Sequence, residues 1–147
     1  MIITIMEIRE QGVKLDPEED IFEGTRVRFT GKELSGIGVL VGYDPAQFRT
    51  AAAAGKTFDV ILDFISMSEF ECSHTKVRES ITALEQDGDY RVRCNVVNVD
   101  PTGQGIVCQA GSALFMISQR VVPASRWEHC KCGDGLLFVG HQLLLWI

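Results

Sequence analysis

Leu136-Leu137-Phe138-Val139-Gly140-His141-Gln142-Leu143-Leu144-Leu145-Trp146-Ile147 is the stretch of sequence on which the fold depends most, because nine of its twelve residues are apolar. The central Gly140-His141 pair predicts a two-residue turn, so residues 136–139 and 142–147 are expected to form a hairpin. A hairpin with one face in water alternates apolar and polar residues. This one does not alternate, so it must be covered on both faces.

Two kinds of structure could bury the apolar faces of this hairpin. One is the protein's own structure, above all a helix expected at residues 75–86, which would make the hairpin part of the monomer's core. The other is a second copy of the chain, because large apolar patches are rarely left exposed on a monomer. On the second interpretation the chain is a homo-oligomer. Its interface residues would be Leu143, Leu145, Trp146 and Ile147.

Most of the remaining chain has the period-2 alternation of β-strands. Residues 25–30, 36–43 and 57–64 alternate in this way, and residues 24–64 are similar in pattern to a small SH3-like barrel. Residues 90–99, 105–110 and 113–120 follow as a meander. The alternation slips at Val96-Val97, which predicts a β-bulge, and Gly111-Ser112 predicts a hairpin turn.

Two short helices interrupt this pattern. Asp44 and Gly55 have the positions of an N-cap and a C-terminal stop around residues 45–54. In residues 75–86, Val77, Ile81 and Leu84 recur at i, i+4 and i+7, as on one face of a helix. The expected fold class is therefore α+β and β-rich. It comprises a bent antiparallel sheet or small barrel, the two short helices and a C-terminal β-meander.

Length and composition predict one domain over residues 1–147. Residues 1–23 are expected to form a first strand followed by an acidic loop. The chain is 46% hydrophobic and 23% charged, which is ordinary for a globular domain. Its net charge is −6, and residues 1–23 contain seven acidic residues against two basic ones. This balance argues against nucleic acid or an anionic membrane as a partner, and no apolar stretch is long enough for a membrane span.

Four arginines form a candidate binding site. Arg26 and Arg28 share one strand face, and Arg91 and Arg93 share another. If those strands were neighbours, the four guanidinium groups could bind an anion. The alternative is that they belong to the charged outer face of a barrel.

The chain has five cysteines, at positions 72, 94, 108, 130 and 132. An odd number with irregular spacing is a poor disulfide framework. The first residues also lack the features of a signal peptide. We therefore expect five free thiols and a cytoplasmic protein.

Cysteine and histidine come together twice, as Cys72-Ser73-His74 and as His129-Cys130-Lys131-Cys132. Two thiolates and one or two imidazoles suit zinc, so Cys72, His74, Cys130 and Cys132 are the candidate ligands. Residues i and i+2 of a strand stand about 6–7 Å apart, which is long for two ligands of one ion. The alternative is that the cysteines are small buried apolar residues.

No set of residues with the spacing of a catalytic site emerges, and none is assigned. The leading hypothesis is a non-catalytic binding or interaction module that self-associates, uses no cofactor and binds an unidentified protein or small molecule. The alternative is a small zinc-binding or thiol-dependent enzyme that uses Cys72, His74, His129, Cys130 and Cys132. In that enzyme Cys72 and the nearby His74 are the best placed thiol and base.

Overall fold

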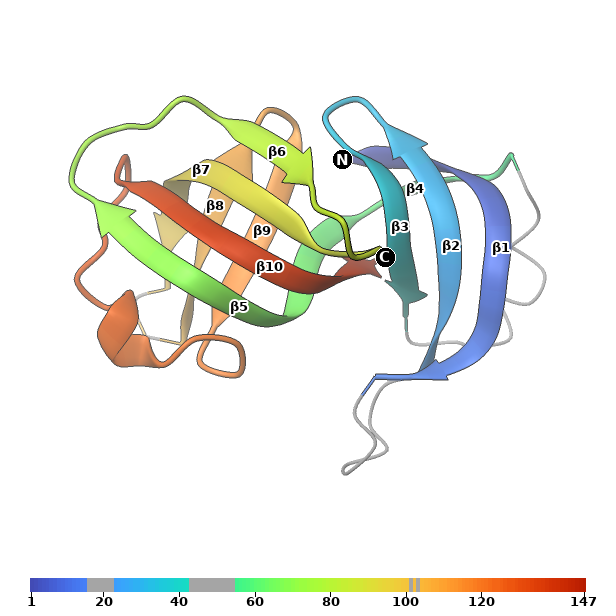
Figure 1. The fold of residues 1–147 in the computed structure, drawn as a ribbon. Helices are drawn as coiled ribbons and strands as arrows, with labels where there is room; N and C mark the ends of the chain where they lie inside the picture. The colour runs from blue at the N-terminus through green and yellow to red at the C-terminus, as the bar shows by residue number, and fades with distance from the viewer. Residues whose placement is uncertain (16–22, 43–54, 101, 103) are drawn as a thin grey trace.

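The structure is a computed structural model that describes residues 1–15, 23–42, 55–100, 102 and 104–147. Within these residues the chain forms strands and one short 3-10 turn, arranged in two lobes (Figure 1). The elements are β1 (Ile2–Lys14), β2 (Glu23–Gly31), β3 (Ser35–Val41), β4 (Thr57–Asp59), β5 (Ile61–Ser73), β6 (Ser80–Ala83), β7 (Tyr90–Val99), β8 (Gly105–Ala110), β9 (Ala113–Ser118), η1 (Ala124–Arg126) and β10 (Gly135–Trp146).

Five strands close into a barrel, which confirms the β-rich, barrel-like part of the expected fold. The expected α+β class is wrong, because the described residues form strands and one short 3-10 turn and contain no α-helix. Strand β10 pairs with both β5 and β7, and the meander β7–β8–β9 continues the sheet. A single parallel pair, Leu62 with Phe115, joins β9 back to β5 and closes the ring. The predicted bulge is confirmed between Val96 and Asn98, and the predicted turn joins β8 to β9.

The second lobe is a sheet of β4, β1, β2 and β3, which extends from the barrel along one edge (Figure 1). Its link to the barrel is a parallel pairing of β3 with the end of β10, where Leu144 stands beside Val39. The strand predicted at residues 25–30 falls in this sheet as β2, and the described part of the strand predicted at 36–43 falls in it as β3. The resemblance of residues 24–64 to one small barrel is therefore wrong, because only β5 among them belongs to the closed barrel.

The predicted C-terminal hairpin is wrong, because β10 continues through Gly140 and His141 as one strand. Its first half pairs with β5 and β7, and its second half pairs with β5 and β3. The strand changes partners at Gln142, whose φ of 62° bends the chain there. The Gly-His pair that predicted a turn therefore lies within a strand that passes from the barrel to the outer sheet.

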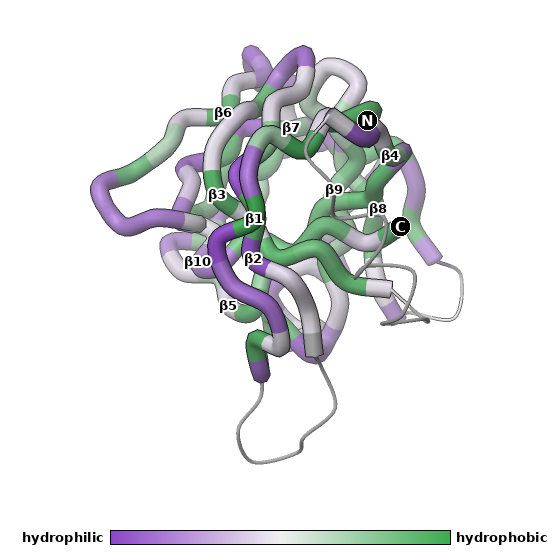
Figure 2. The backbone as a smooth tube through the Cα atoms, turned by 90° about the vertical axis from the view of Figure 1, so that its right-hand side faces the viewer, coloured by the Kyte–Doolittle hydropathy of each residue, from purple (hydrophilic) through white to green (hydrophobic). Residues whose placement is uncertain are grey.

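Residues on both faces of the C-terminal half of β10 are buried. Leu143 and Leu145 are fully buried in the main core, while Leu144 points to the other side. There Leu144 packs with Val39 and Val41 in a second, smaller cluster. The centre of the main core is aromatic, since the rings of Phe64, Phe115 and Phe138 lie with centroids 6.0–6.1 Å apart. Figure 2 shows hydrophobic stretches in the barrel strands β8 and β9.

The predicted helix at residues 75–86 is wrong, because this segment contains strand β6. Strand β8 pairs with β7 only from Asn95 to Val99, and β6 pairs with the remaining residues Tyr90–Arg93. An unpaired sheet edge leaves strong donors and acceptors without partners, so pairing with this edge is favoured over a local helix. The helix expected at residues 45–54 and the acidic loop lie outside the described residues.

Candidate metal centre

A cysteine from the barrel and a His-Cys pair from a loop meet at one end of β5. Cys72 is the penultimate residue of β5 and pairs with Leu136 of β10. His129 and Cys130 lie in the loop that connects η1 to β10. The meeting therefore depends on the antiparallel pairing of β5 with β10, which brings the end of one strand beside the start of the other.

Backbone hydrogen bonds and one buried aromatic residue fix the loop. Trp127 is fully buried and its indole N–H donates to the carbonyl of Val122 at 2.9 Å. The N–H of Cys130 donates to the carbonyl of Trp127 at 3.0 Å, which turns the chain directly after this anchor. Gly133, at φ 91°, provides a second bend before β10. His129 and Cys130 are thus held on a short, defined turn.

The donor atoms of Cys72, His129 and Cys130 all lie within 4.8 Å of one another. Two sulfur ligands about 2.3 Å from one zinc ion in a tetrahedron stand about 3.8 Å apart. The Cys72 and Cys130 sulfurs are in direct contact, so they must separate before they can hold one ion between them. Cys130 is buried, Cys72 is half-buried and His129 is exposed. An ion bound here would be shielded from solvent on the side of Cys130 and would be reached by solvent on the side of His129.

Two further polar residues border this group. The imidazole of His74 lies 6.0 Å, centroid to centroid, from that of His129. Its Nδ1 is 3.3 Å from the carboxylate of Asp134, which also lies 3.9 Å from the Cys72 sulfur. A histidine that donates Nδ1–H to a carboxylate has Nε2 free for a metal, a common arrangement around zinc. His74 lies outside the three donor atoms that converge within 4.8 Å, but it borders them and is a candidate fourth ligand.

Asp134 is a functional candidate that the sequence analysis missed. Its carboxylate accepts the backbone N–H of Lys131 at 2.9 Å, and this bond, with the contact to His74, lowers the pKa of the carboxyl group. The lowered pKa keeps Asp134 ionised at neutral pH, so this buried residue places a negative charge beside the cysteines. No local pattern identifies it, since it follows a Gly in an ordinary-looking turn.

Cys72 and Cys130 form a disulfide in the structure. The free cysteines among the described residues are Cys94, Cys108 and Cys132, so the expectation of five free thiols differs from the structure at this pair. A disulfide sulfur is not a thiolate ligand, so the same two residues can bind a metal only when they are reduced. The pairing nonetheless shows that the fold brings these two cysteines into direct contact.

Cys132, predicted as a ligand, lies outside this group. It is exposed, and its thiol donates to the carbonyl of Val97 at 3.7 Å. Cys94 and Cys108 are buried in the core, where burial raises the pKa of the Cys108 thiol. These two fit the alternative interpretation of cysteine as a small apolar residue.

The four arginines do not form one patch. Arg26 and Arg28 of β2 bind Glu10 and Glu7 of β1, each at 2.8 Å. Arg91 of β7 lies 3.8 Å from Glu69. Because β3 and β10 separate β2 from β7 in the sheet, the two arginine pairs belong to different surfaces.

The predicted interface residues have unequal exposure. Leu143 and Leu145 are fully buried, and Trp146 is half-buried against the second cluster. Ile147 is 49% exposed. Of the four predicted interface residues, Ile147 is therefore the one whose side chain is most accessible to a second copy of the chain.

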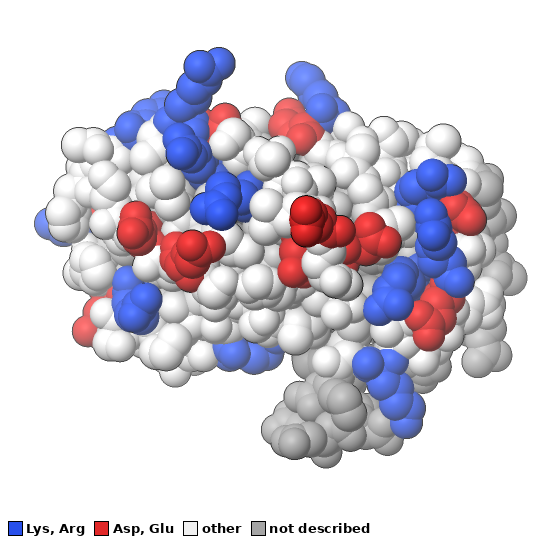
Figure 3. Space-filling model, in the orientation of Figure 1, with Lys and Arg blue, Asp and Glu red and all other residues white. Residues whose placement is uncertain are grey.

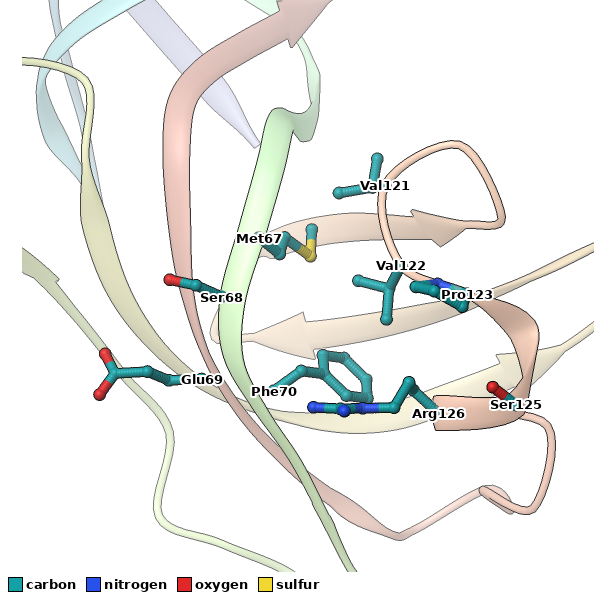
Figure 4. A pocket seen from close by; sticks show the side chains of 9 residues that line it. All are labelled: Met67, Ser68, Glu69, Phe70, Val121, Val122, Pro123, Ser125 and Arg126. Carbon is teal, nitrogen blue, oxygen red and sulfur yellow. The ribbon is translucent and has the colours of Figure 1, made fainter.

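A hollow of about 420 Å³ lies beside η1 (Figure 4). Met67 and Phe70 point into it from β5, opposite Val122 and Arg126, whereas Ser68 points to the other side of the strand. The hollow is lined by apolar residues together with Ser68, Glu69, Ser125 and the guanidinium group of Arg126.

Comparisons with protein-family models, curated proteins and solved structures found no match. No helix in the described part of the chain has the length and apolar character needed to cross a membrane.

Proposed function

We propose that this protein binds zinc through Cys72, His129 and Cys130, with His74 as the fourth ligand. The observation that supports the proposal is the convergence of three donor atoms within 4.8 Å from two segments 57 residues or more apart in sequence. Two thiolates and two imidazoles are a common ligand set for zinc. Four protein ligands would give the ion a structural role, tying the loop before β10 to the end of β5.

The test is zinc binding by the reduced protein. After reduction, loading and removal of free metal, we expect about one zinc per chain by elemental analysis. Cobalt in place of zinc should show the visible absorption of tetrahedral coordination and a thiolate-to-metal band. Affinity should fall on acidification, because the ligands must lose their protons to bind.

Matched variants locate the site. Cys72→Ser, Cys130→Ser and His129→Gln should each lose the metal. Cys132→Ser is the control, since Cys132 is exposed and lies outside the group. Reduced protein that retains no zinc would refute the proposal, as would equal zinc loss from Cys132→Ser and Cys130→Ser.

The contact between Cys72 and Cys130 supports a second candidate role, a structural disulfide. Thiol titration under denaturing, non-reducing conditions distinguishes the two. Three titratable thiols correspond to the disulfide, and five correspond to the reduced pair that zinc requires.

A further inference from the structure

A serine, a histidine and an aspartate form a hydrogen-bonded row on the outside of the barrel. The Oγ atom of Ser68 lies 2.8 Å from Nε2 of His141, and Nδ1 of His141 lies 3.0 Å from Oδ2 of Asp89. We propose that Ser68 is an acyl-accepting nucleophile, with His141 as its base and Asp89 as the group that orients the base. We propose further that its substrates are small esters carrying a negative charge.

The strand register produces this row. In the pairing of β10 with β5, Val139 stands opposite Ser68 and His141 opposite Ser66. On the other side of β10, Gly140 stands opposite Tyr90, which places Asp89 beside His141. Side chains two residues apart share a strand face, so Ser68 and His141 are on the same outer face and meet diagonally. Figure 4 confirms that the Ser68 side chain points away from the apolar hollow.

Hydrogen bonds define the role of each group. The backbone N–H of Gln142 donates to Oδ1 of Asp89 at 3.1 Å, so both carboxylate oxygens of Asp89 are occupied. An ionised carboxylate only accepts hydrogen bonds, which places the proton of a neutral His141 on Nδ1. Nε2 then has its lone pair directed at Ser68 and accepts the hydroxyl proton. This is the arrangement of nucleophile, base and orienting group found in activated serines.

Unusual backbone geometry follows both reacting residues. Glu69 has φ 51° and Gln142 has φ 62°, and within the described residues they are the two non-glycine residues with positive φ. They directly follow Ser68 and His141. The β5–β10 register also shifts between Leu137 and Val139, which puts a bulge in β5 immediately after Ser68. Bulges and strained residues of this kind occur preferentially next to active sites, where they aim a side chain.

The charges beside Ser68 indicate the substrate class. Val139, opposite Ser68, has Arg91 on its other side, and the Arg91 guanidinium reaches to 3.8 Å from the carboxylate of Glu69. Both side chains are more than half exposed, so this ion pair is weak and can be exchanged for another anion. A hollow of about 120 Å³ adjoins it, lined by Glu69, Glu71, Arg91, Arg93 and Leu137 among others. Basic side chains gather above acidic ones on this lobe in Figure 3. A carboxylate or phosphate that replaces Glu69 on Arg91 would bring its ester group to Ser68.

The proposed reaction is hydrolysis in two steps. Ser68 Oγ attacks the ester carbonyl while its proton passes to Nε2 of His141. The tetrahedral intermediate expels the alcohol, which takes that proton, and the acyl group remains on Ser68. Water then attacks this acyl-serine with His141 again as the base, releasing the acid and restoring the Ser68 hydroxyl.

The test uses two chromogenic esters, 4-nitrophenyl hydrogen succinate and 4-nitrophenyl acetate. We expect 4-nitrophenol release and an acylated protein by intact mass, with the acyl group located on Ser68 by peptide mass spectrometry. Ser68→Ala should abolish both, and His141→Gln should reduce the rate about 100-fold or more. Ser66→Ala is the matched control, an exposed serine on the same strand face, and should react like the wild type.

Several outcomes would overturn the proposal. One is a wild-type protein that is not acylated, and another is equal labelling of Ser66 and Ser68. Unchanged turnover by a Ser68→Ala variant shown to be folded by circular dichroism would do the same. Arg91→Gln should reduce the preference for the succinate ester over the acetate ester about tenfold, and an unchanged preference would refute the substrate class. A chelator should leave acylation unchanged, which separates this site from the proposed zinc centre.

Discussion

Single residues join the two lobes, and Tyr90 is the clearest example. It is almost fully buried, and its hydroxyl donates to the carbonyl of Ile37 at 3.2 Å, which links β7 to β3. Burial raises the pKa of Tyr90 to about 12. An unfolded tyrosine titrates near pH 10, so between these values the folded protein binds more protons than the unfolded chain.

We therefore predict that the stability contributed by Tyr90 is fully present below about pH 10 and is lost as the pH rises toward 12. Tyr90→Phe should cost about 1 kcal/mol near neutral pH through the lost hydrogen bond. Above pH 10 the difference between wild type and variant should shrink. Urea unfolding at several pH values measures both effects, and a difference that does not change with pH would contradict the assignment.

Gly140 is a residue at which only a hydrogen atom fits. A Cβ atom added there would lie 2.5 Å from the ring of Phe64, which is packed among other core aromatics. Gly140→Ala should destabilise the protein by about 1–3 kcal/mol, measured by urea unfolding. Gly38→Ala is the control with a smaller expected loss, because its Cβ would be 3.1 Å from the flexible end of Leu145.

At the level of elements, the segment that contains β6 depends on one buried amide. The side chain of Asn95 accepts the N–H of Val77 at 2.9 Å and donates to its carbonyl at 3.0 Å. Asn95 thus acts as a strand partner for a segment whose apolar spacing alone predicts a helix. Through these two hydrogen bonds, the buried Asn95 of β7 favours the extended conformation of residues 77–83.

Asn95→Ala should cost about 1–3 kcal/mol, because it leaves two backbone groups of Val77 without partners. Hydrogen exchange should accelerate in residues 77–83 in particular. The control is Asn98→Ala, an exposed asparagine on the same strand. Unchanged exchange in residues 77–83 would show that this amide does not hold the segment.

At the level of the whole molecule, β10 holds the two lobes together, since one strand contributes to both hydrophobic clusters. Leu144 is fully buried between Val39 and Val41 in the second cluster. Leu144→Ala should cost about 2–5 kcal/mol by urea unfolding. Ile147→Ala, at a residue that is 49% exposed, should cost much less. Equal losses would show that the second cluster is not packed in this way.

Self-association remains a prediction. The structure shows which of the four predicted interface residues can be substituted to test it without disturbing the core. Leu143, Leu145 and Trp146 have packing roles within the monomer, so substituting them would confuse loss of an interface with loss of the core. Ile147→Glu avoids this difficulty. Sedimentation equilibrium should show a weaker dimer for this variant if the C-terminal segment forms the interface, and a wild-type chain that is monomeric at tens of micromolar would refute the idea.

The sequence by itself determined which segments are strands over most of the described chain. The bulge at Val96-Val97 and the turn at Gly111-Ser112 were also readable, because they depend on neighbouring residues. The need to cover both faces of residues 143–147 followed from the absence of polar residues there. The identity of the neighbouring strands, β3 and β5 in place of the expected helix, did not follow from it.

Only the tertiary structure decided the conformation of residues 75–86, the continuity of β10 and the membership of both candidate sites. Val77, Ile81 and Leu84 have helical spacing, but their segment forms a strand because it pairs with the free edge of β7. Gly140-His141 predicts a turn, but the pair lies within a strand because β10 is paired on both sides. Ser68 and His141 lie 73 residues apart, and Cys72 and Cys130 lie 58 apart. Each pair meets through the register of β5 with β10, and register between distant strands is fixed by the packing of the whole core, which local sequence patterns do not specify.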